Sequence, residues 1–460
     1  MRARCPLSRL WVLALVAVMC PGLSAADGKR NVLMLLVDDL RPELGCYGED
    51  EIKTPNIDAL AKAGVRFDRA YVQYPLCNPS RSSMLNGRYP SVTGVMDNTT
   101  YFADAHPDFV SLPKYFKQNG YAALRAGKIF HGSIDDTDAW TEGGEKRRVE
   151  TQEQLQQRRR TQPMQSDRIV ELEGDGEKHA DYKTAQSTIA FLEQYRDKPF
   201  LMACGFTKPH SAPTAPKNIF ERYDAAKMTL PVDFQSIAKA PEGFPAASIP
   251  ARNGDLFINR EATPEAAREM LRAYRASATF TDENVGRVMK QFNALGLGKN
   301  TVIVFWGDHG YHLGEKGKWS KHGSLFEIGT RVPLIIIEPG AAGNGKVCKR
   351  LVQSIDIYPT LCELAGLPVP QGLNGASLAP LLKNPDAPWD RPAYSFAGQV
   401  KNPHKAVRTA KYRYAEYTGD NGGAMLFDEE ADPHEMKNLA NDPKYADVVK
   451  EMKALLGKLP

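Results

Sequence analysis

Four stretches of the chain are continuous runs of apolar residues, each about as long as one β-strand. They cover residues 31–37, 199–205, 301–306 and 332–337. A strand that is apolar on both faces is typical of a mostly parallel sheet buried between helices. Helical patterns separate these runs, and the longest, from about Pro264 to Leu295, has Thr263 as its expected N-cap. The alternation predicts a doubly wound α/β sheet with helices on both faces, which binds ligands beyond the carboxyl ends of its strands.

The first residues have the composition of a targeting segment. Three arginines precede an apolar run from Leu10 to Met19, and small residues follow at 24–26. This pattern is typical of a secretory signal peptide, and the run is too short to span a membrane. We therefore expect residues 1–26 to be removed and the mature protein to be secreted or periplasmic, without membrane insertion. A catalytic α/β domain is predicted at 27–382, and short strands with a final helix predict a smaller α+β domain at 383–460.

Charge and cysteine content exclude several classes of protein. Without the three arginines of the signal, the 59 basic residues fall to 56, against 55 acidic residues. A nearly neutral protein has no global field that gathers polyanions, so we expect no nucleic-acid partner. The five cysteines beyond the signal are far apart, without the spacing of a disulfide framework or a zinc site.

Two stretches interrupt the α/β pattern and are predicted to be surface excursions, residues 135–180 and 230–262. The first carries two basic triplets, at 146–148 and 158–160. Such triplets can grip a polyanionic glycan, but a run of charge is more often a solvated face, which is the interpretation we favour.

Two acidic motifs follow apolar strands. Asp38 and Asp39 come directly after the first, and Asp308 and His309 come after the third, between glycines. Carboxyl ends of strands in one sheet can converge on a single crevice. Adjacent carboxylates repel each other unless a cation neutralises them, so the two motifs together favour a shared hard divalent metal over a helix cap with an exposed neighbour.

The motif from Cys77 to Arg81 reads Cys-Asn-Pro-Ser-Arg. Pro79 suits the first turn of a helix and Gly87 its end, which places Cys77 at the N-terminus, where backbone N–H groups favour an anion. Cys77 and Arg81 are four residues apart, so they can lie near one face. Cys77 could therefore be a thiolate of low pKa, while the alternative is a buried, inert cysteine.

This motif is similar to the C-x-P-S-R signature of type I sulfatases. The resemblance extends over nearly the whole mature chain, through NVLMLLVDDLRPELGCYG, GYAALRAGKIFH, KPH and GDHGYHLGEKGKWSKH, and is strongest to the iduronate-2-sulfatase-like branch. It implies an alkaline-phosphatase-like fold. It also implies that a formylglycine-generating enzyme oxidises Cys77 to formylglycine.

The resemblance further implies a set of site residues. One calcium ion would be bound by Asp38, Asp39, Asp308, His309 and the modified Cys77. The sulfate would be surrounded by Lys128, His131, His210 and Lys321, with Arg81 beside the nucleophile. In such a site one hydroxyl of the hydrated aldehyde attacks sulfur, and the second then expels sulfate. His131 would assist the aldehyde, and either His210 or Lys321 would protonate the leaving group.

The chain departs from the family pattern at a few positions. Asn86 stands where Thr is usual, and His309 stands where many members have Asn. Lys316 and His322 differ near the expected rim of the substrate site, so the sugar is left open. His312 either lines that site or packs beside it.

The function predicted from these motifs is hydrolysis of a sulfate ester on a sulfated sugar or glycan. One alternative is a phosphoester or phosphonate hydrolase of the same superfamily, and another is a catalytically silent protein that binds sulfated glycans. A cysteine-thiolate phosphatase is disfavoured, because three residues separate Cys77 from Arg81 where that chemistry usually has five.

Overall fold

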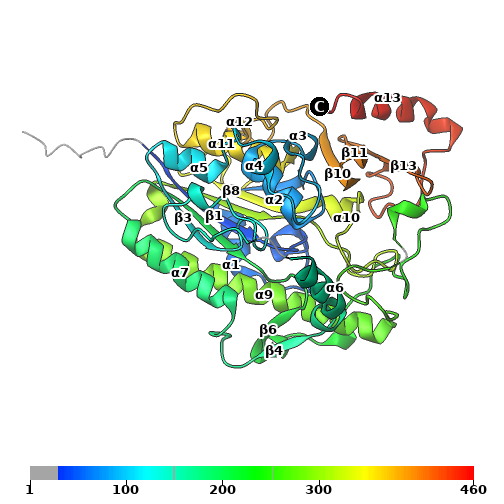
Figure 1. Ribbon diagram of the computed structural model, residues 1–460, viewed down its shortest axis with the longest axis horizontal. Helices are drawn as coiled ribbons and strands as arrows, with labels where there is room; N and C mark the ends of the chain where they lie inside the picture. The colour runs from blue at the N-terminus through cyan, green and yellow to red at the C-terminus, as the bar shows by residue number, and fades with distance from the viewer. Residues whose placement is uncertain (1–28, 149–150, 251) are drawn as a thin grey trace, which may run out of the picture.

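A seven-stranded sheet forms the centre of the molecule (Figure 1). The structure is a computed structural model that describes residues 29–148, 151–250 and 252–460, so the predicted signal peptide lies outside the described residues. In order across the sheet, the strands are β3 (Ala122–Gly127), β5 (Phe200–Phe206), β1 (Asn31–Val37), β7 (Thr301–Gly307), β8 (Arg331–Ile337), β2 (Val65–Tyr71) and β9 (Val347–Gln353).

All neighbouring strands are parallel except at β8, which is antiparallel to both β7 and β2. The predicted mostly parallel sheet is therefore confirmed. The segment between β7 and β8 contains only the four-residue helix α10 (Glu327–Thr330). A parallel return usually runs through a full helix packed on the sheet; this long segment has none, and the chain comes back in the opposite direction.

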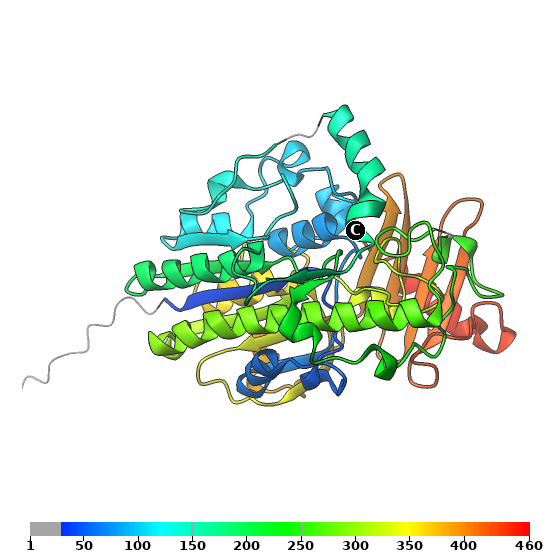
Figure 2. The same cartoon turned by 90° about the horizontal axis from the view of Figure 1, so that it is seen from below.

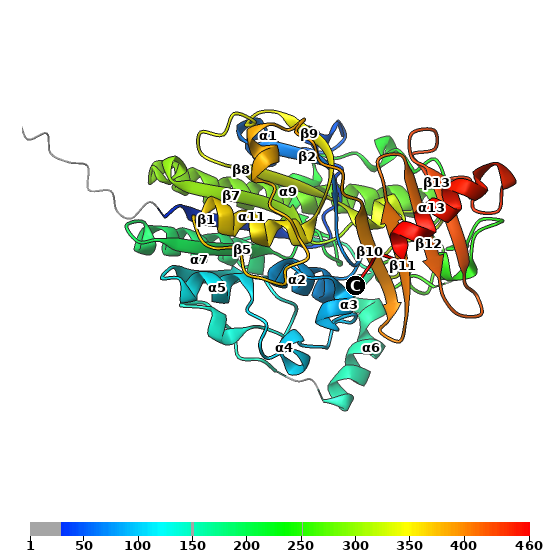
Figure 3. The ribbon, with the colours of Figure 1, turned by 90° about the horizontal axis from the view of Figure 1, so that it is seen from above.

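Helices cover both faces of the sheet (Figures 2 and 3). One face packs against α1 (Pro55–Ala63), α7 (Ala180–Tyr195) and α9 (Pro264–Ala294), and the other against α2 (Cys77–Asn86), α5 (Leu112–Gln118), α11 (Ile357–Leu364) and α12 (Ala379–Lys383). The continuous apolar run of β1 explains this arrangement. Val32, Met34 and Leu36 join the core on one side, and Leu33, Leu35 and Val37 join the core on the other. Thr263 caps α9 as predicted, because its side chain accepts a hydrogen bond from Ala266 N.

The last part of the chain forms a second, antiparallel sheet at one end of the molecule (Figure 3). Its strands are β10 (Ala393–Gln399), β11 (Asn402–Arg408), β12 (Tyr412–Tyr417) and β13 (Gly423–Asp428), and α13 (Ala446–Leu456) packs against it. Phe396 and Tyr414 of this sheet share a buried cluster with Tyr74 and Tyr89 of the main body. The smaller C-terminal α+β unit is thus confirmed, while its boundary at 382/383 stays a prediction.

The remaining α-helices and strands lie outside the two larger sheets and the helices that cover them. They are α3 (Pro90–Thr93), α4 (Phe102–Ala105), α6 (Gln152–Ser166), β4 (Val170–Leu172), β6 (Thr214–Pro216) and α8 (Lys217–Phe220). The prediction that 230–262 is a surface excursion is wrong in part, since Leu256 and Phe257 are buried in a cluster with residues of α9. Within the described ranges, no helix has the length and apolarity required to cross a membrane.

Candidate active site

The carboxyl ends of β1 and β7 bring the two acidic motifs together. Asp39, just beyond β1, has a φ of 61°. Aspartate tolerates this left-handed conformation better than most residues, and it turns the chain where Asp38 and Asp39 would otherwise point to opposite faces. Beyond β7, Gly310 is required, because a Cβ there would lie 2.0 Å from the Ile328 carbonyl oxygen.

Four buried side chains at this edge form a group that could hold a metal ion. Asp38, Asp39, Cys77 and His309 each offer one ligand atom, and these atoms all lie within 4.8 Å of one another. His309 Nε2 lies 3.3 Å from Cys77 Sγ and 3.3 Å from Asp39 Oδ1. Asp308 lies beside the group, with Oδ1 accepting a hydrogen bond of 3.1 Å from Asp39 N.

The geometry of this group fits a cation. His309 Nδ1 is 3.0 Å from the Gly310 carbonyl oxygen, which can only accept a hydrogen bond, so in the neutral ring Nε2 carries the lone pair. That lone pair faces carboxylates, an arrangement that repels unless a positive charge lies between them. Among the described residues, Asp38 Oδ1 is buried without a hydrogen-bond partner. Burial and the neighbouring Asp38 raise the pKa of Asp308 to about 6, whereas Lys128, His210 and Arg81 outweigh burial and lower the pKa of Asp38.

Cys77 begins α2, as predicted, and Gly87 ends it with a φ of 61°. All residues of the helix are buried. Burial and the Asp38 carboxylate raise the pKa of the Cys77 thiol well above its ordinary value. The hypothesis of a thiolate of low pKa is therefore not supported, and Cys77 would need chemical modification to become a good nucleophile.

Arg81 lies one turn into α2 and connects the helix to the carboxyl ends of β1 and β7. Its Nε donates a hydrogen bond of 2.8 Å to Asp308 Oδ2, and its Nη1 donates to the carbonyl oxygens of Lys128 and Ile129 at 2.6 and 3.0 Å. Nη2 is buried, has no hydrogen-bond partner among the described residues, and lies 3.7 Å from Asp38 Oδ1. One donor of the guanidinium is therefore left for a ligand.

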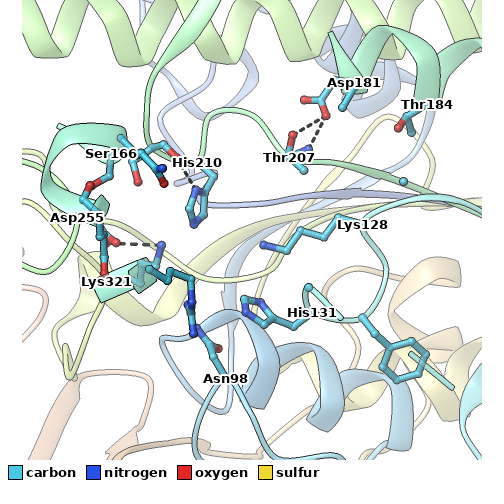
Figure 4. Close-up of a pocket in the computed structure, with 18 of the residues that line it drawn as sticks. Asn98, Lys128, His131, Ser166, Asp181, Thr184, Thr207, His210, Asp255 and Lys321 are labelled. Carbon is cyan, nitrogen blue, oxygen red and sulfur yellow. Dashed lines mark hydrogen bonds and ion pairs between the residues drawn. The ribbon is translucent and has the colours of Figure 1, made fainter. Parts of the chain in front are cut away.

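A cavity of about 590 Å³ opens beside the cluster of Asp38, Asp39, Cys77 and His309, called the acidic group from here on. The predicted sulfate-binding residues Lys128, His131, His210 and Lys321 all line it. Figure 4 shows Lys128, His131 and His210 directed toward a common space. The Lys128 amine donates to Asp38, and the Lys321 amine lies 2.9 Å from Asp39 Oδ2, so the wall of the cavity and the acidic group are directly connected.

The lysines and histidines of this wall differ in charge. Burial alone would lower the pKa of both amines, but the Asp38 carboxylate raises that of Lys128, and Asp255 and Asp39 raise that of Lys321. Burial and Lys128 lower the pKa of His131 well below its ordinary value, and burial and Lys321 lower the pKa of His210. The free protein therefore presents two cations and two neutral imidazoles near pH 7.

Two residues of the site were not assigned a role from the sequence. Asp255 lies in the Pro- and Gly-rich segment that was predicted as surface, yet it is 4% exposed and its carboxylate is 3.5 Å from the Lys321 amine. Lys208 is also buried, and its amine donates to the carbonyl oxygens of His210 and Ala212, which fixes the loop that carries His210. No motif or periodicity marks Asp255, whereas Lys208 belongs to the KPH motif and only its own role was not predicted.

Of the three residues considered for the rim of the substrate site, only one lines the cavity. Lys316 does not line this cavity but a second hollow, where its buried amine is 2.6 Å from Asp233 Oδ2. The prediction that it lies at the substrate rim is therefore wrong. His322 does line the cavity, and His312 packs beside it, where its Nε2 is 2.6 Å from Ser324 Oγ.

Comparison with known proteins gives consistent matches along the chain. The family model described as Sulfatase matches residues 30–367, and the one described as N-sulphoglucosamine sulphohydrolase, C-terminal, matches residues 314–460. A sulfatase of Formosa agariphila is 33% identical over 94% of this chain and 87% of its own length. The iduronate 2-sulfatase of Mus musculus is 32% identical over 76% of this chain and 71% of its own. The solved structure of a 2-O GAG sulfatase is 27% identical, with a TM-score of 0.69 over 93% of this chain and 91% of that one.

Proposed function

The chain belongs to the sulfatase family of sulfuric ester hydrolases, and from this premise we propose that it cleaves a sulfate ester on a sulfated sugar by means of a formylglycine made from Cys77. Family membership confirms the resemblance inferred from the Cys77–Arg81 motif. The sugar class is supported by relatives described as iduronate 2-sulfatase and as Δ4,5-hexuronate-2-O-sulfatase. The exact sugar and the position of its sulfate are left open.

One observation supports the proposal most directly. Cys77 lies within the group of side chains that could hold a metal ion, at a helix N-terminus, next to a cavity whose wall carries two lysines and two histidines. A sulfate ester carries one negative charge that spreads over more oxygens as the S–O bond breaks. Cations and hydrogen-bond donors fixed around it in a buried site stabilise that charge.

We propose that Asp38, Asp39, Asp308, His309 and the modified Cys77 hold one calcium ion. When bound, the ion and the hydrated formylglycine would supply positive charge and a hydroxyl nucleophile. Arg81 Nη2, which has no other hydrogen-bond partner among the residues described, would stabilise negative charge at position 77. The neutral His131 ring can accept a proton from the same position.

The two residues proposed for the leaving group differ in what they can do. Lys321 is held by Asp39 and remains charged, so it suits a hydrogen bond to the leaving oxygen. His210 Nδ1 donates to the Ser211 carbonyl oxygen at 2.8 Å, which leaves Nε2 free on the side of the cavity. We propose that His210 Nε2, protonated when the anionic substrate binds, delivers the proton to the leaving oxygen.

Maturation by a formylglycine-generating enzyme and export by the segment 1–26 belong to the same proposal. The test is sulfate release from an aryl sulfate and from sulfated sugars by protein co-produced with that enzyme. Hydrolysis of phosphonate or phosphate esters at a higher rate, measured by the alcohol released, would instead identify the superfamily alternative. Saturable sugar binding without any hydrolysis would identify a silent binding protein.

A further inference from the structure

The segment 310–330 runs from the active site to α10 and is attached there to the second sheet (Figure 1). Arg413 of β12 donates a hydrogen bond from Nη1 to the Leu325 carbonyl oxygen at 3.2 Å. Glu435, in the loop after β13, accepts a hydrogen bond of 2.8 Å from Glu327 N, the first residue of α10. The start of α10 is therefore bound by two separate parts of the C-terminal unit.

The other side of α10 holds the residues that follow the proposed metal ligand His309. Gly310 N donates to the Gly329 carbonyl oxygen at 3.0 Å, and Tyr311 N donates to the Ile328 carbonyl oxygen at 3.1 Å. Only α10 thus lies between the second sheet and the chain next to the acidic group. A change in how the sheet binds α10 would be transmitted to both ends of the segment.

The contact between α10 and the second sheet is built from charged side chains. The Arg413 guanidinium is 1% exposed, binds Glu327 through Nη2, and has its Nε 3.0 Å from Glu429 Oε1 and 3.1 Å from Glu435 Oε1. Arg408 Nε lies 3.2 Å from Glu327 Oε2 and 3.5 Å from Glu429 Oε1. Three carboxylates therefore meet two guanidinium groups, and one negative charge is in excess.

Other groups on the neighbouring elements do not remove this excess at close range. The titratable side chains that face the junction from outside it are Lys316, Arg331, Tyr71 and Tyr417. The Lys316 amine is bound by Asp233, and Arg331 Nε donates to the Asp68 carbonyl oxygen at 2.6 Å. Burial raises the pKa of both tyrosine hydroxyls, so these stay neutral. The two cations thus act on the carboxylates only from farther away.

Glu429 and Glu435, called the acid pair from here on, compete for one hydrogen. Both Oε1 atoms approach Arg413 Nε, which has a single N–H, and that N–H is donated to Glu429. Glu435 Oε1 is buried and has no hydrogen-bond partner among the described residues. Two ionised carboxylates placed in this way repel each other, whereas a proton on one of them can be donated to the other. Burial raises the pKa of Glu435 to about 7, and burial and the neighbouring carboxylates raise that of Glu429 well above its ordinary value.

We propose that the acid pair shares one proton and that its two members are positioning residues, which hold the segment 310–330 and its Lys321 in place through Arg413 and α10. Loss of the proton would place two like charges together and loosen the second sheet from α10. This lock gives the C-terminal unit a role in the site, and it would operate whether or not the site cleaves sulfate esters.

Urea unfolding at pH 5 and pH 8 tests the shared proton. Glu435→Gln imitates the protonated pair, because its amide can donate to Glu429 while its oxygen still accepts from Glu327 N. A pKa raised in the folded state means that stability is present at low pH and lost as pH rises through about 7. The unfolding equilibrium constant of the wild type, relative to that of Glu435→Gln, should therefore rise at least about tenfold from pH 5 to pH 8.

Two further variants complete this test. Glu429→Gln removes the other member of the acid pair and should give the same result, including where Glu435→Gln does not fold. Glu430→Gln, an exposed change beside the pair, is the matched control and should follow the wild type. If the wild type keeps a constant ratio to both pair variants from pH 5 to pH 8, no proton is shared.

Hydrogen exchange of the unmodified protein tests the positioning role without any need for sulfate release. At pH 8, amides in 310–330 should exchange at least about fivefold faster in the wild type than in Glu435→Gln, and at pH 5 the two should agree. In the matured enzyme the same variant should lose less kcat than the wild type between pH 6 and pH 8, with KM unchanged. Faster exchange confined to residues 393–435, with 310–330 unaffected, would refute the positioning role.

Discussion

Cys77 Sγ and His309 Nε2 lie 3.3 Å apart, although 232 positions separate them in the chain. The contact joins the N-terminus of α2 to the carboxyl end of β7. The cysteine is buried there beside carboxylates, and burial and the Asp38 carboxylate raise the pKa of its thiol. The site is therefore unsuited to thiolate chemistry and suited to a modified residue beside a cation. The predictions below test the parts of this arrangement separately.

Calcium should stabilise the folded protein through the acidic group. A ligand that binds only the native state raises the free energy of unfolding by about 2.7 kcal/mol at a hundred times its Kd. We expect calcium added after chelation to raise Tm in the wild type, and Asp39→Asn to abolish most of this shift. Asp50→Asn, an exposed change, is the control. Thermal unfolding with and without calcium measures both, and an undiminished shift in Asp39→Asn would place the ion elsewhere.

His210 and Lys321 should differ in their dependence on the leaving group. Removing a proton donor costs little when the leaving group is acidic, whereas removing a stabilising cation affects every substrate. His210→Ala should lower kcat about 100-fold on a sugar sulfate but less than about tenfold on 4-nitrophenyl sulfate. Lys321→Ala should lower both by about 100-fold.

Steady-state kinetics on the two substrates check this assignment. The calcium-induced shift in Tm must be retained in both variants, so that a lost ion does not explain the result. A loss in His210→Ala that is equal on the two substrates would mean that His210 does not protonate the leaving oxygen.

Asp255 should act as a positioning residue for Lys321. Its carboxylate lies 3.5 Å from the Lys321 amine and raises the pKa of that amine. Asp255→Asn should therefore lower kcat about tenfold and move the basic limb of the pH–rate profile to lower pH, with KM changed less. Asp233→Asn, which loses a comparable pair with Lys316 outside the cavity, is the control. If the pH profile of Asp255→Asn is unchanged, Asp255 has a purely structural role.

Asp282 should make the stability of the fold depend on pH. It accepts hydrogen bonds from Ile57 N and the Asn56 side chain at the start of α1, and burial raises its pKa to about 6. Because this pKa is above the unfolded value of about 3.9, the folded state binds the proton more tightly, and stability is lost as pH rises from about 4 to 6.

Urea unfolding of the wild type and Asp282→Asn from pH 4 to 7 measures this effect. The free energy of unfolding of the wild type relative to the variant should fall over that interval by at most about 3 kcal/mol. A difference that stays constant from pH 4 to 7 would show that Asp282 does not titrate there.

Much of the fold and the placement of the site could be predicted because the signals are local. The continuous apolar run of β1 requires burial on both faces, and Asp38 and Asp39 follow it directly, so the strand determines where they lie. Pro79 and Gly87 mark the two ends of α2 in the same way. In each case a short stretch of residues determines both the element and the position of the functional side chain.

Other features depend on contacts between distant segments and could not be predicted. The antiparallel direction of β8 follows from the course of a long loop, which no periodicity describes. Asp255 lies in a segment without a strand or helix pattern, and only its approach to Lys321 reveals a role. Lys316 faces Asp233 instead of the cavity, although Lys321, five residues later, lines it. The catalytic roles of the site residues and the domain boundary at 382/383 stay predictions.

The most direct test of the account is the mass of the peptide that contains Cys77, from protein co-produced with a formylglycine-generating enzyme. Conversion of CH2SH to CHO should remove about 18 mass units, and sulfate release from an aryl sulfate should rise in proportion to the converted fraction. An unmodified cysteine with no sulfate release, or full conversion without any release, would contradict the proposal that this site is a formylglycine-dependent sulfatase.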